Sequence, residues 1–217
     1  MKKGLFYGFT ALLTLAGLLA VAWQWGNFPP RVPTHWNVQG HIDGWGPRWL
    51  LWLFALLPGL MGGLAFLVPR LDPKRENYAR HETAFFVTMG FSVVIMAVAF
   101  WAIFAAASGH PVRVSFILPL AMGLGFIVMG NFLPQVKYNY LFGIRTPWTL
   151  ANEEVWRKTH RLSGYVFVAM GLGAIASVFF EGKAIAAAFW IVPMIAGITT
   201  LFVYSWWVGR GLAKKGS

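Results

Sequence analysis

The sequence predicts an all-α, polytopic membrane protein with six transmembrane helices. Of the 217 residues, 58% are hydrophobic and only 12% are charged, about half the charged share of an average soluble domain. The apolar residues also form long runs without Asp, Glu, Lys or Arg. Crossing a hydrocarbon layer about 30 Å thick takes about 20 such residues in a helix. Strands of a membrane barrel would instead alternate apolar and polar residues, and these runs do not alternate.

Six stretches of the sequence meet this length requirement. The first follows Lys2 and Lys3, as the apolar region of a signal peptide would, but it is longer than such a region. It ends at Trp23 and Trp25, which are typical anchors at a membrane interface, so we predict a retained first helix. The six predicted spans cover residues 4–25, 49–69, 83–107, 114–136, 162–180 and 184–208.

The distribution of Lys and Arg predicts that both termini are cytoplasmic, because cytoplasmic loops retain positive charge. In this orientation the inner segments hold 14 of the 18 Lys and Arg residues, and only Arg31, Arg48, Arg113 and Lys183 lie outside. Topology and attraction to anionic lipids thus account for the formal net charge of +11. The predicted partner of the basic surface is the lipid bilayer, and no direct contact with nucleic acid is expected.

We expect a single membrane domain made of two halves. The N-terminal half, 1–110, would contain the first three helices and an outer loop at 26–48. The C-terminal half, 111–217, would contain the last three helices and a cytoplasmic loop at 137–161. Both loops are long enough to do more than connect two helices.

Composition predicts different structures for the two loops. The outer loop is rich in Pro and Gly, which break regular structure, so it is predicted to be irregular. The inner loop contains Thr149 and Asn152, which are residue types that start helices. A short interfacial helix from about Asn152 is therefore expected to lead into the fifth span.

A proline lies four residues before a glycine in the second, fourth and sixth predicted helices. Proline kinks a helix and glycine lets a neighbouring backbone approach, so three such helices side by side could surround a cleft. A small-molecule or lipid transporter is therefore one alternative function, and ordinary packing of membrane helices is the simpler interpretation. The three pairs are Pro58 with Gly62, Pro119 with Gly123, and Pro193 with Gly197.

The outer loop brings His35, Asn37, His41 and Asp43 within nine residues. Imidazole and carboxylate groups bind zinc well, so His35, His41 and Asp43 are weak metal candidates, and a membrane metalloenzyme is a second alternative. The spacing matches no standard metal motif, and we favour a hydrogen-bonded cap with a turn at Gly40. Because the sequence shows no cysteine, catalytic triad or nucleotide loop, we predict no catalytic residue, no cofactor and no enzyme activity.

The inner loop contains the densest set of candidate binding residues. Arg145 can bind a phosphate or carboxylate through two parallel hydrogen bonds, but it can equally anchor the loop to lipid headgroups beside Trp148 and Trp156. The residues alone leave these two roles open. The set comprises Asn139, Gly143, Arg145, Thr146, Pro147, Trp148, Thr149 and Trp156.

Two sequence runs resemble known families. The run NYLFGIRTPWTLANEEVWRKTHRLSG at 139–164 resembles the signature of the SdpI family of bacterial membrane proteins, N-x-x-F-G-I-R-T-P-W-T-L followed by V-W-x-x-T-H. The run VPTHWNVQGHIDGWG at 32–46 resembles the outer-loop motif P-x-H-x-N-x-x-G-x-x-D-G of DUF1648, a domain of unknown function often found in the N-terminal half of the same proteins.

The resemblance implies a multi-pass protein of the bacterial cytoplasmic (inner) membrane that gives immunity to a secreted antimicrobial peptide. It further implies that the protein senses the toxin and holds a helix-turn-helix repressor at the membrane. Carried onto this chain, the resemblance places toxin contact at His35, Asn37, Gly40 and Asp43, and a signalling surface at Asn139, Gly143, Arg145, Thr146, Pro147, Trp148 and Thr149. The hypothesis is thus a binding protein, with the metalloenzyme and the transporter as alternatives.

Overall fold

The computed structural model describes residues 2–37, 39–180 and 183–214. Its six long helices are long and apolar enough to cross a membrane, which confirms the predicted polytopic α-helical fold. They are α1 (Lys3–Gln24), α2 (Leu50–Leu71), α3 (Glu82–Ala107), α4 (Val114–Phe132), α6 (Glu153–Val178) and α7 (Ala184–Ala213). The shorter elements are η1 (Trp25–Asn27), β1 (Arg31–Trp36), β2 (Ile42–Pro47), η2 (Arg75–His81), η3 (Leu133–Gln135) and α5 (Pro147–Ala151).

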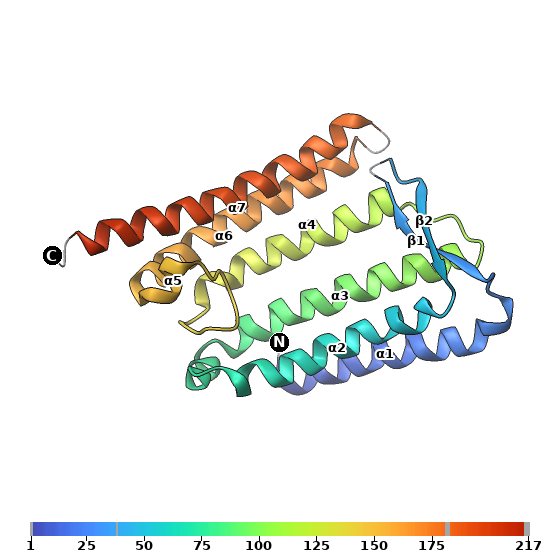
Figure 1. Cartoon of the computed structure of the whole chain (residues 1–217), viewed down its shortest axis with the longest axis horizontal. Helices are drawn as coiled ribbons and strands as arrows, with labels where there is room; N and C mark the ends of the chain where they lie inside the picture. Colours follow the sequence, from blue (N-terminus) through green and yellow to red (C-terminus); the bar gives the residue numbers. More distant parts are fainter. Residues whose placement is uncertain (1, 38, 181–182, 215–217) are drawn as a thin grey trace.

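The long helices lie side by side, and each packs on its neighbours in one layered bundle (Figure 1). Helices α1, α2 and α3 pack on one another, α4 packs on α3, α6 on α4, and α7 on α6. The β1–β2 ribbon lies at one end of the bundle, here named the hairpin end. Helix α5 and both chain termini lie at the opposite end, here named the motif end (Figure 1).

Helices α4 and α6 approach each other through glycine. A methyl group built on Gly123 of α4 would lie 2.7 Å from the carbonyl oxygen of Gly171 of α6, and one on Gly130 would lie 2.7 Å from the carbonyl oxygen of Gly164. Without a driving force from water, membrane helices associate through close packing of small residues. The seven-residue spacing on both helices therefore forms a seam that holds α6, and the loop preceding it, against α4.

The prediction of an irregular outer loop is wrong, because residues 31–47 of that loop form an antiparallel two-stranded ribbon. Strand β1 pairs with β2 from Arg31 opposite Pro47 to Trp36 opposite Ile42, with irregular register on both sides of His35. Proline cannot donate a ladder hydrogen bond, but in a two-stranded ribbon every residue belongs to an edge strand, where proline is tolerated. The high Pro and Gly content therefore did not exclude strands.

The three proline-containing helices do not enclose a common cleft within the described part of the chain. Helix α2 packs against α1 and α3, α4 against α3 and α6, and α7 against α5 and α6. The glycines that follow the prolines face helices other than these three: Gly62 faces Thr10 of α1, and Gly123 and Gly197 face α6. These glycines thus serve the ordinary helix packing that was the alternative interpretation.

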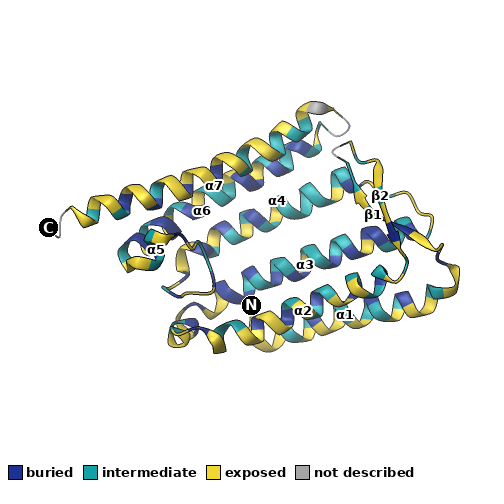
Figure 2. Ribbon diagram, viewed as in Figure 1, coloured by how far each residue is buried: buried dark blue, intermediate teal, exposed yellow. Residues whose placement is uncertain are grey.

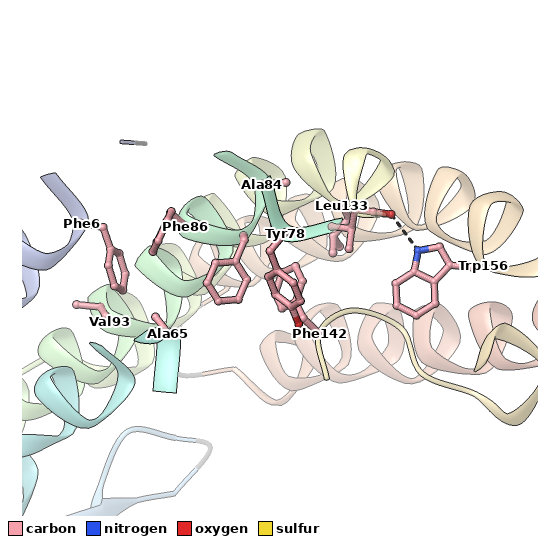
Figure 3. Packing of buried hydrophobic residues seen from close by; sticks show 11 residues of the cluster. Phe6, Ala65, Tyr78, Ala84, Phe86, Val93, Leu133, Phe142 and Trp156 are labelled. Carbon is pink, nitrogen blue, oxygen red and sulfur yellow. Dashed lines mark hydrogen bonds between the residues drawn. The ribbon is translucent and has the colours of Figure 1, made fainter. Parts of the chain in front are cut away.

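The main buried cluster joins the two halves of the chain at the motif end. Figure 3 shows it extending from Phe6 of α1 past Phe86 of α3 and the loop residue Phe142 to Trp156 of α6. The dashed line marks the indole nitrogen of Trp156, which donates to the carbonyl oxygen of Val136 at 2.9 Å. Exposed residues lie mostly on the outward faces of the helices (Figure 2), as expected where lipid replaces water.

Candidate functional site

The first candidate site is the loop 137–161 at the motif end. Its second half contains two capped helix starts. Thr146 caps α5, since its hydroxyl accepts from the amide of Thr149 while Thr149 accepts from the amide of Thr146. Asn152 caps α6 by accepting from the amides of Glu154 and Val155. Asn152 is therefore a helix start, as predicted, but Thr149 belongs to the box that starts α5. The expected helix from Asn152 is present, but it is the first part of α6, which runs unbroken from residue 153 to 178, and not a separate interfacial helix.

The preceding segment, 137–146, has no regular secondary structure. Most of its backbone amides instead donate hydrogen bonds to side chains. Asp72, just after α2, is 2% exposed. Its Oδ2 accepts from the amides of Tyr140 and Leu141, both at 2.9 Å, and from the hydroxyl of Tyr78 at 3.0 Å. Its Oδ1 accepts from the amide of Lys74 at 2.7 Å. Only an acceptor with two oxygens and no proton to donate can satisfy four such donors.

Asn139 and two histidines accept hydrogen bonds from other amides of the same segment. Asn139 Oδ1 accepts from the amides of Leu141 (3.1 Å) and Phe142 (2.7 Å). His81 Nδ1 accepts from the amide of Lys137 at 3.3 Å. His160 Nε2 accepts from the amide of Ile144 at 3.1 Å, and its Nδ1 lies 2.9 Å from the carbonyl oxygen of Trp156. His160 is therefore neutral with its proton on Nδ1, because a protonated imidazole could not accept.

Gly143 allows the segment to turn over the buried histidine. Its φ is +108°, a conformation that favours glycine, and an added methyl group would lie 2.5 Å from His160 Nε2 and 3.3 Å from the ring of Trp156. Trp156 is 1% exposed and stacks on His160 with 4.1 Å between ring centroids. The backbone thus passes directly over these two rings, which fixes the path of the segment.

The eight predicted residues of the inner loop fall into a buried set and an exposed set. Asn139, Thr146, Thr149 and Trp156 are buried, and their polar groups bond within the protein. Gly143 and Trp148 are half-buried, with Trp148 packed on Phe202 and Gly209 of α7. Arg145 and Pro147 are exposed. Arg145 donates to the carbonyl oxygen of Tyr140 at 3.5 Å, so its guanidinium lies on the loop surface.

Tyr138 connects the segment 137–146 to α5 and α6. Its hydroxyl donates to the carbonyl oxygen of Leu150 at 2.5 Å, and its ring packs edge-on against Trp156. Partial burial raises the pKa of Tyr138 to about 12, and the hydrogen bond to Tyr140 is the second contribution. The phenol therefore stays protonated at physiological pH and keeps donating to α5.

The hairpin end contains the second candidate site. The tip of the ribbon is a turn in which Asn37 Oδ1 accepts from the amides of Gln39 and His41, while Gly40 adopts φ +83°. A methyl group on Gly40 would lie 2.7 Å from the hydroxyl of Ser115, so the tip rests on the first turn of α4. Asn37 and Gly40 thus shape the tip and dock it on the bundle.

His35 and Asp43 pair with each other across the ribbon. His35 Nδ1 lies 2.5 Å from Asp43 Oδ1, and both side chains are exposed. Among residues 2–37, 39–180 and 183–214, no three His, Asp or Glu side chains are grouped so that they could bind a metal ion. His35, His41 and Asp43 therefore do not form a three-ligand site, and the geometry matches the hydrogen-bonded cap.

A hollow of about 290 Å³ lies beside the ribbon tip, between the ends of α4, α6 and α7. Trp36 and Trp190 border it, and the polar side chains at its wall are Asn37, Ser115 and Ser177. The rest of its lining is apolar. The hollow can therefore receive an apolar side chain and offers a few hydrogen-bonding groups at its rim.

Several residues that organise the motif end were not predicted from the sequence. They are Asp72, Tyr78, His81, His160 and Ser205. Only Asp72 gives a signal in the sequence, because it is an acid between Arg70 and Lys74 in a segment rich in Lys and Arg. His160 stands inside the quoted V-W-x-x-T-H run, yet nothing local shows that its ring would accept an amide sixteen residues away.

Comparison with known proteins relates both candidate sites to described families. Residues 135–206 match the SdpI/YfhL protein family and residues 12–61 match the domain of unknown function DUF1648. The chain is 33% identical over 100 residues to "Immunity protein SdpI" of Bacillus subtilis (strain 168), covering 46% of this chain and 48% of that protein. It is 32% identical over 119 residues to an "Uncharacterized protein" of Aquifex aeolicus (strain VF5), covering 54% of this chain and 28% of that protein.

The chain thus spans about half of the first relative and less than a third of the second. No solved structure matches it. The segment 137–161 falls within the first matched region, and the β1–β2 ribbon falls within the second. This chain is therefore a polytopic α-helical membrane protein that carries an SdpI/YfhL family segment at 135–206 and a DUF1648 segment at 12–61.

Proposed function

We propose that this chain is an immunity protein of a bacterial cytoplasmic membrane, which protects the cell against a secreted antimicrobial peptide. The observation that carries this proposal is the 33% identity over 100 residues to the protein named "Immunity protein SdpI". Two features of the structure support it: a mostly apolar hollow at the hairpin end, where a peptide could bind, and a segment at the motif end whose amides bond to buried side chains.

The proposal requires the hairpin end to face outside. The placement of charge supports this orientation, because the α2–α3 connection at the motif end contains Arg70, Lys74, Arg75 and Arg80. The loop before α6 adds further basic residues. Positive charge of this kind is retained on the cytoplasmic side.

Cysteine labelling in intact cells tests this orientation without background, because the chain contains no cysteine. Gln39→Cys and Ala151→Cys suit the test since both positions are exposed, whereas Asn37 and Asn152 hold turns and caps. A membrane-impermeant maleimide should label Gln39→Cys in intact cells and Ala151→Cys only after permeabilisation. The reverse pattern would invert the topology and place the hollow on the wrong side for a secreted peptide.

Within this function, we place peptide contact at the hollow beside the ribbon tip. A membrane-active peptide lies in the interface with its apolar side chains pointing inward, and the tryptophan-bordered hollow lies between the ends of α4, α6 and α7, where tryptophan is typical of a membrane interface. The exposed His35–Asp43 pair adds a polar surface on the ribbon nearby. An apolar or aromatic side chain of the peptide would fill the hollow, because most of its lining is apolar.

Survival in co-culture tests immunity and the hollow together. A strain deleted for this gene, grown with its parent under starvation, should be killed by the parent and rescued by the intact gene. Ala187→Phe, which fills the hollow, should lose most of the rescue, because Ala187 lines it. Ala188→Phe is the matched control, since the neighbouring Ala188 is exposed and does not line the hollow. Immunoblotting of membranes checks that both variants accumulate equally.

Two results would count against the proposal in different ways. Survival of the deletion strain beside a parent that secretes a lytic peptide would contradict immunity to that peptide. Equal rescue by Ala187→Phe and the intact gene would leave immunity standing and contradict the hollow as the contact site.

At the motif end, a cytoplasmic repressor would have a small exposed surface to bind. Arg145 and Pro147 are exposed, as are Tyr140 and Leu141 in part. The other motif residues form the support beneath them. We propose that signalling, where it occurs, uses this exposed surface, with the guanidinium of Arg145 as its charged contact.

A further inference from the structure

Helix α7 lies at the edge of the bundle, and its outward face packs on no other helix of the described part of the chain. The helix packs against α6 and, at the motif end, against α5. The side chains that turn away from these neighbours are exposed along most of the helix (Figure 2). Ile195, Val203 and Trp207 are each at least half exposed. This face is therefore open to the surroundings of the bundle.

The outward face of α7 carries hydroxyl groups at membrane depth. Thr199 and Thr200 lie near the middle of its 30 residues, and both are exposed. Neither hydroxyl has a hydrogen-bond partner among the described residues. Thr10 and Thr14 of α1 instead donate to the carbonyl oxygen four residues earlier, both at 2.8 Å. Hydrocarbon cannot pair a hydroxyl, whereas a neighbouring protein helix can.

The same face contains a hollow whose shape suits a helix. The α7 hollow has a volume of about 460 Å³ and is lined by Thr199, Thr200, Val203, Tyr204 and Trp207. Positions 200, 203, 204 and 207 follow the spacing i, i+3, i+4, i+7, and four such residues surround the hole that receives one side chain of a facing helix. All five residues belong to α7, so the opposite wall has to come from a further helix.

We propose that this face of α7 pairs with the same face of a second copy of the chain. Copies inserted into one membrane share one orientation, so a two-fold axis along the membrane normal brings each residue beside its own copy at the same depth. Thr199 and Thr200 then lie opposite the same residues of the second copy. Because a hydroxyl both donates and accepts, identical hydroxyls pair with each other. A different protein would need a matching hydroxyl at this depth, and a second copy carries one.

This pairing is separate from the proposed function. The α7 hollow shares no lining residue with the hollow beside the ribbon tip, where we place peptide contact. The exposed Arg145 belongs to the loop before α5 and not to α7. The pairing therefore leaves both candidate sites open, and either proposal can fail without the other.

Disulfide cross-linking in native membranes tests the pairing, because the chain contains no cysteine. Val203→Cys places a thiol on the proposed face, so oxidation with copper phenanthroline should give a dimer on a non-reducing gel. Ile198→Cys is the matched control. Ile198 is 60% exposed and Val203 50%, but five residues place them about 140° apart around the helix, so Ile198→Cys should stay mostly monomeric. Equal cross-linking of the two variants, or more in Ile198→Cys, would overturn the proposal.

Removing the hydroxyls adds a second readout. Valine keeps the shape of threonine without its hydroxyl, so the double variant Thr199→Val and Thr200→Val should fold as the wild type does. An interhelical hydrogen bond changes affinity about threefold, and two such pairs predict dimer dissociation that is about tenfold weaker in sedimentation equilibrium in detergent. Thr14→Val is the control, because its hydroxyl bonds within α1. A wild-type chain that stays monomeric, or equal dissociation constants in the double variant and the control, would contradict the pairing.

Discussion

Replacing Asp72 by asparagine is expected to lower the melting temperature of the purified protein by on the order of 10 °C. The buried carboxylate accepts from the amides of Lys74, Tyr140 and Leu141 and from the hydroxyl of Tyr78. Asparagine has the same shape but one accepting oxygen fewer, so at least one buried donor would face an NH₂ group. We expect a loss of about 3 kcal/mol, and each kcal/mol shifts the melting temperature of a chain of this size by about 2–4 °C.

Glu76→Gln is the control for this substitution. It makes the same chemical change four residues away, at an exposed position of η2, so its melting temperature should stay within about 1 °C of the wild type. Unfolding can be followed by tryptophan fluorescence in detergent. Trypsin cleavage after Lys137 or Arg145 should also become faster in Asp72→Asn only. Equal stability of the two variants would mean that Asp72 does not hold the segment.

Gly171→Ala is expected to destabilise the protein although alanine favours helices more than glycine does. A methyl group at this position would lie 2.5 Å from the carbonyl oxygen of Gly123 and 3.0 Å from the amide nitrogen of Ile127. Both are backbone atoms of α4, so neither can move aside as a side chain would. The helices must separate, at a cost of about 1–3 kcal/mol for overpacking, which exceeds the gain of about 1 kcal/mol in helix propensity.

Gly63→Ala separates propensity from packing. Gly63 also lies in the interior of a spanning helix, but nothing would lie within 4 Å of an added methyl group. Its melting temperature should remain unchanged or rise slightly, while that of Gly171→Ala falls by several degrees. If both variants behave alike, the α4–α6 seam does not depend on close backbone contact.

Local sequence patterns were sufficient for the spans because the signal for a spanning helix lies within the helix itself. Apolar runs of the right length located all six helices, and α3 ends at Ala107 as expected. The largest error concerns α6, which starts at Glu153 and not at 162. The first turns of α6 contain charged residues, which water or lipid headgroups can solvate outside the hydrocarbon core. The apolar run therefore begins later in the sequence than the helix does. The caps at Thr146 and Asn152 mark these starts better than hydropathy does.

The candidate site was only partly predictable, because its hydrogen bonds join residues far apart in the sequence. Asn139, Gly143 and Trp156 belong to a recognisable run, but the run does not show that they face inward. Asp72 reaches Tyr140 across 68 residues, and Lys137 reaches His81 across 56. No periodicity or motif of either segment alone contains such a pairing.

The sequence by itself determined that this protein lies in a membrane, because its apolar runs are long enough to span one. It also determined the family resemblance, because the runs at 32–46 and 139–164 identify the segments that carry the family match. Only the tertiary structure decided that the Pro- and Gly-rich outer loop is a ribbon, and that most of the inner motif supports a loop and leaves Arg145 exposed. The physical reason is that a buried amide must find an acceptor wherever the fold brings one close. Chain neighbours do not reveal which one that is.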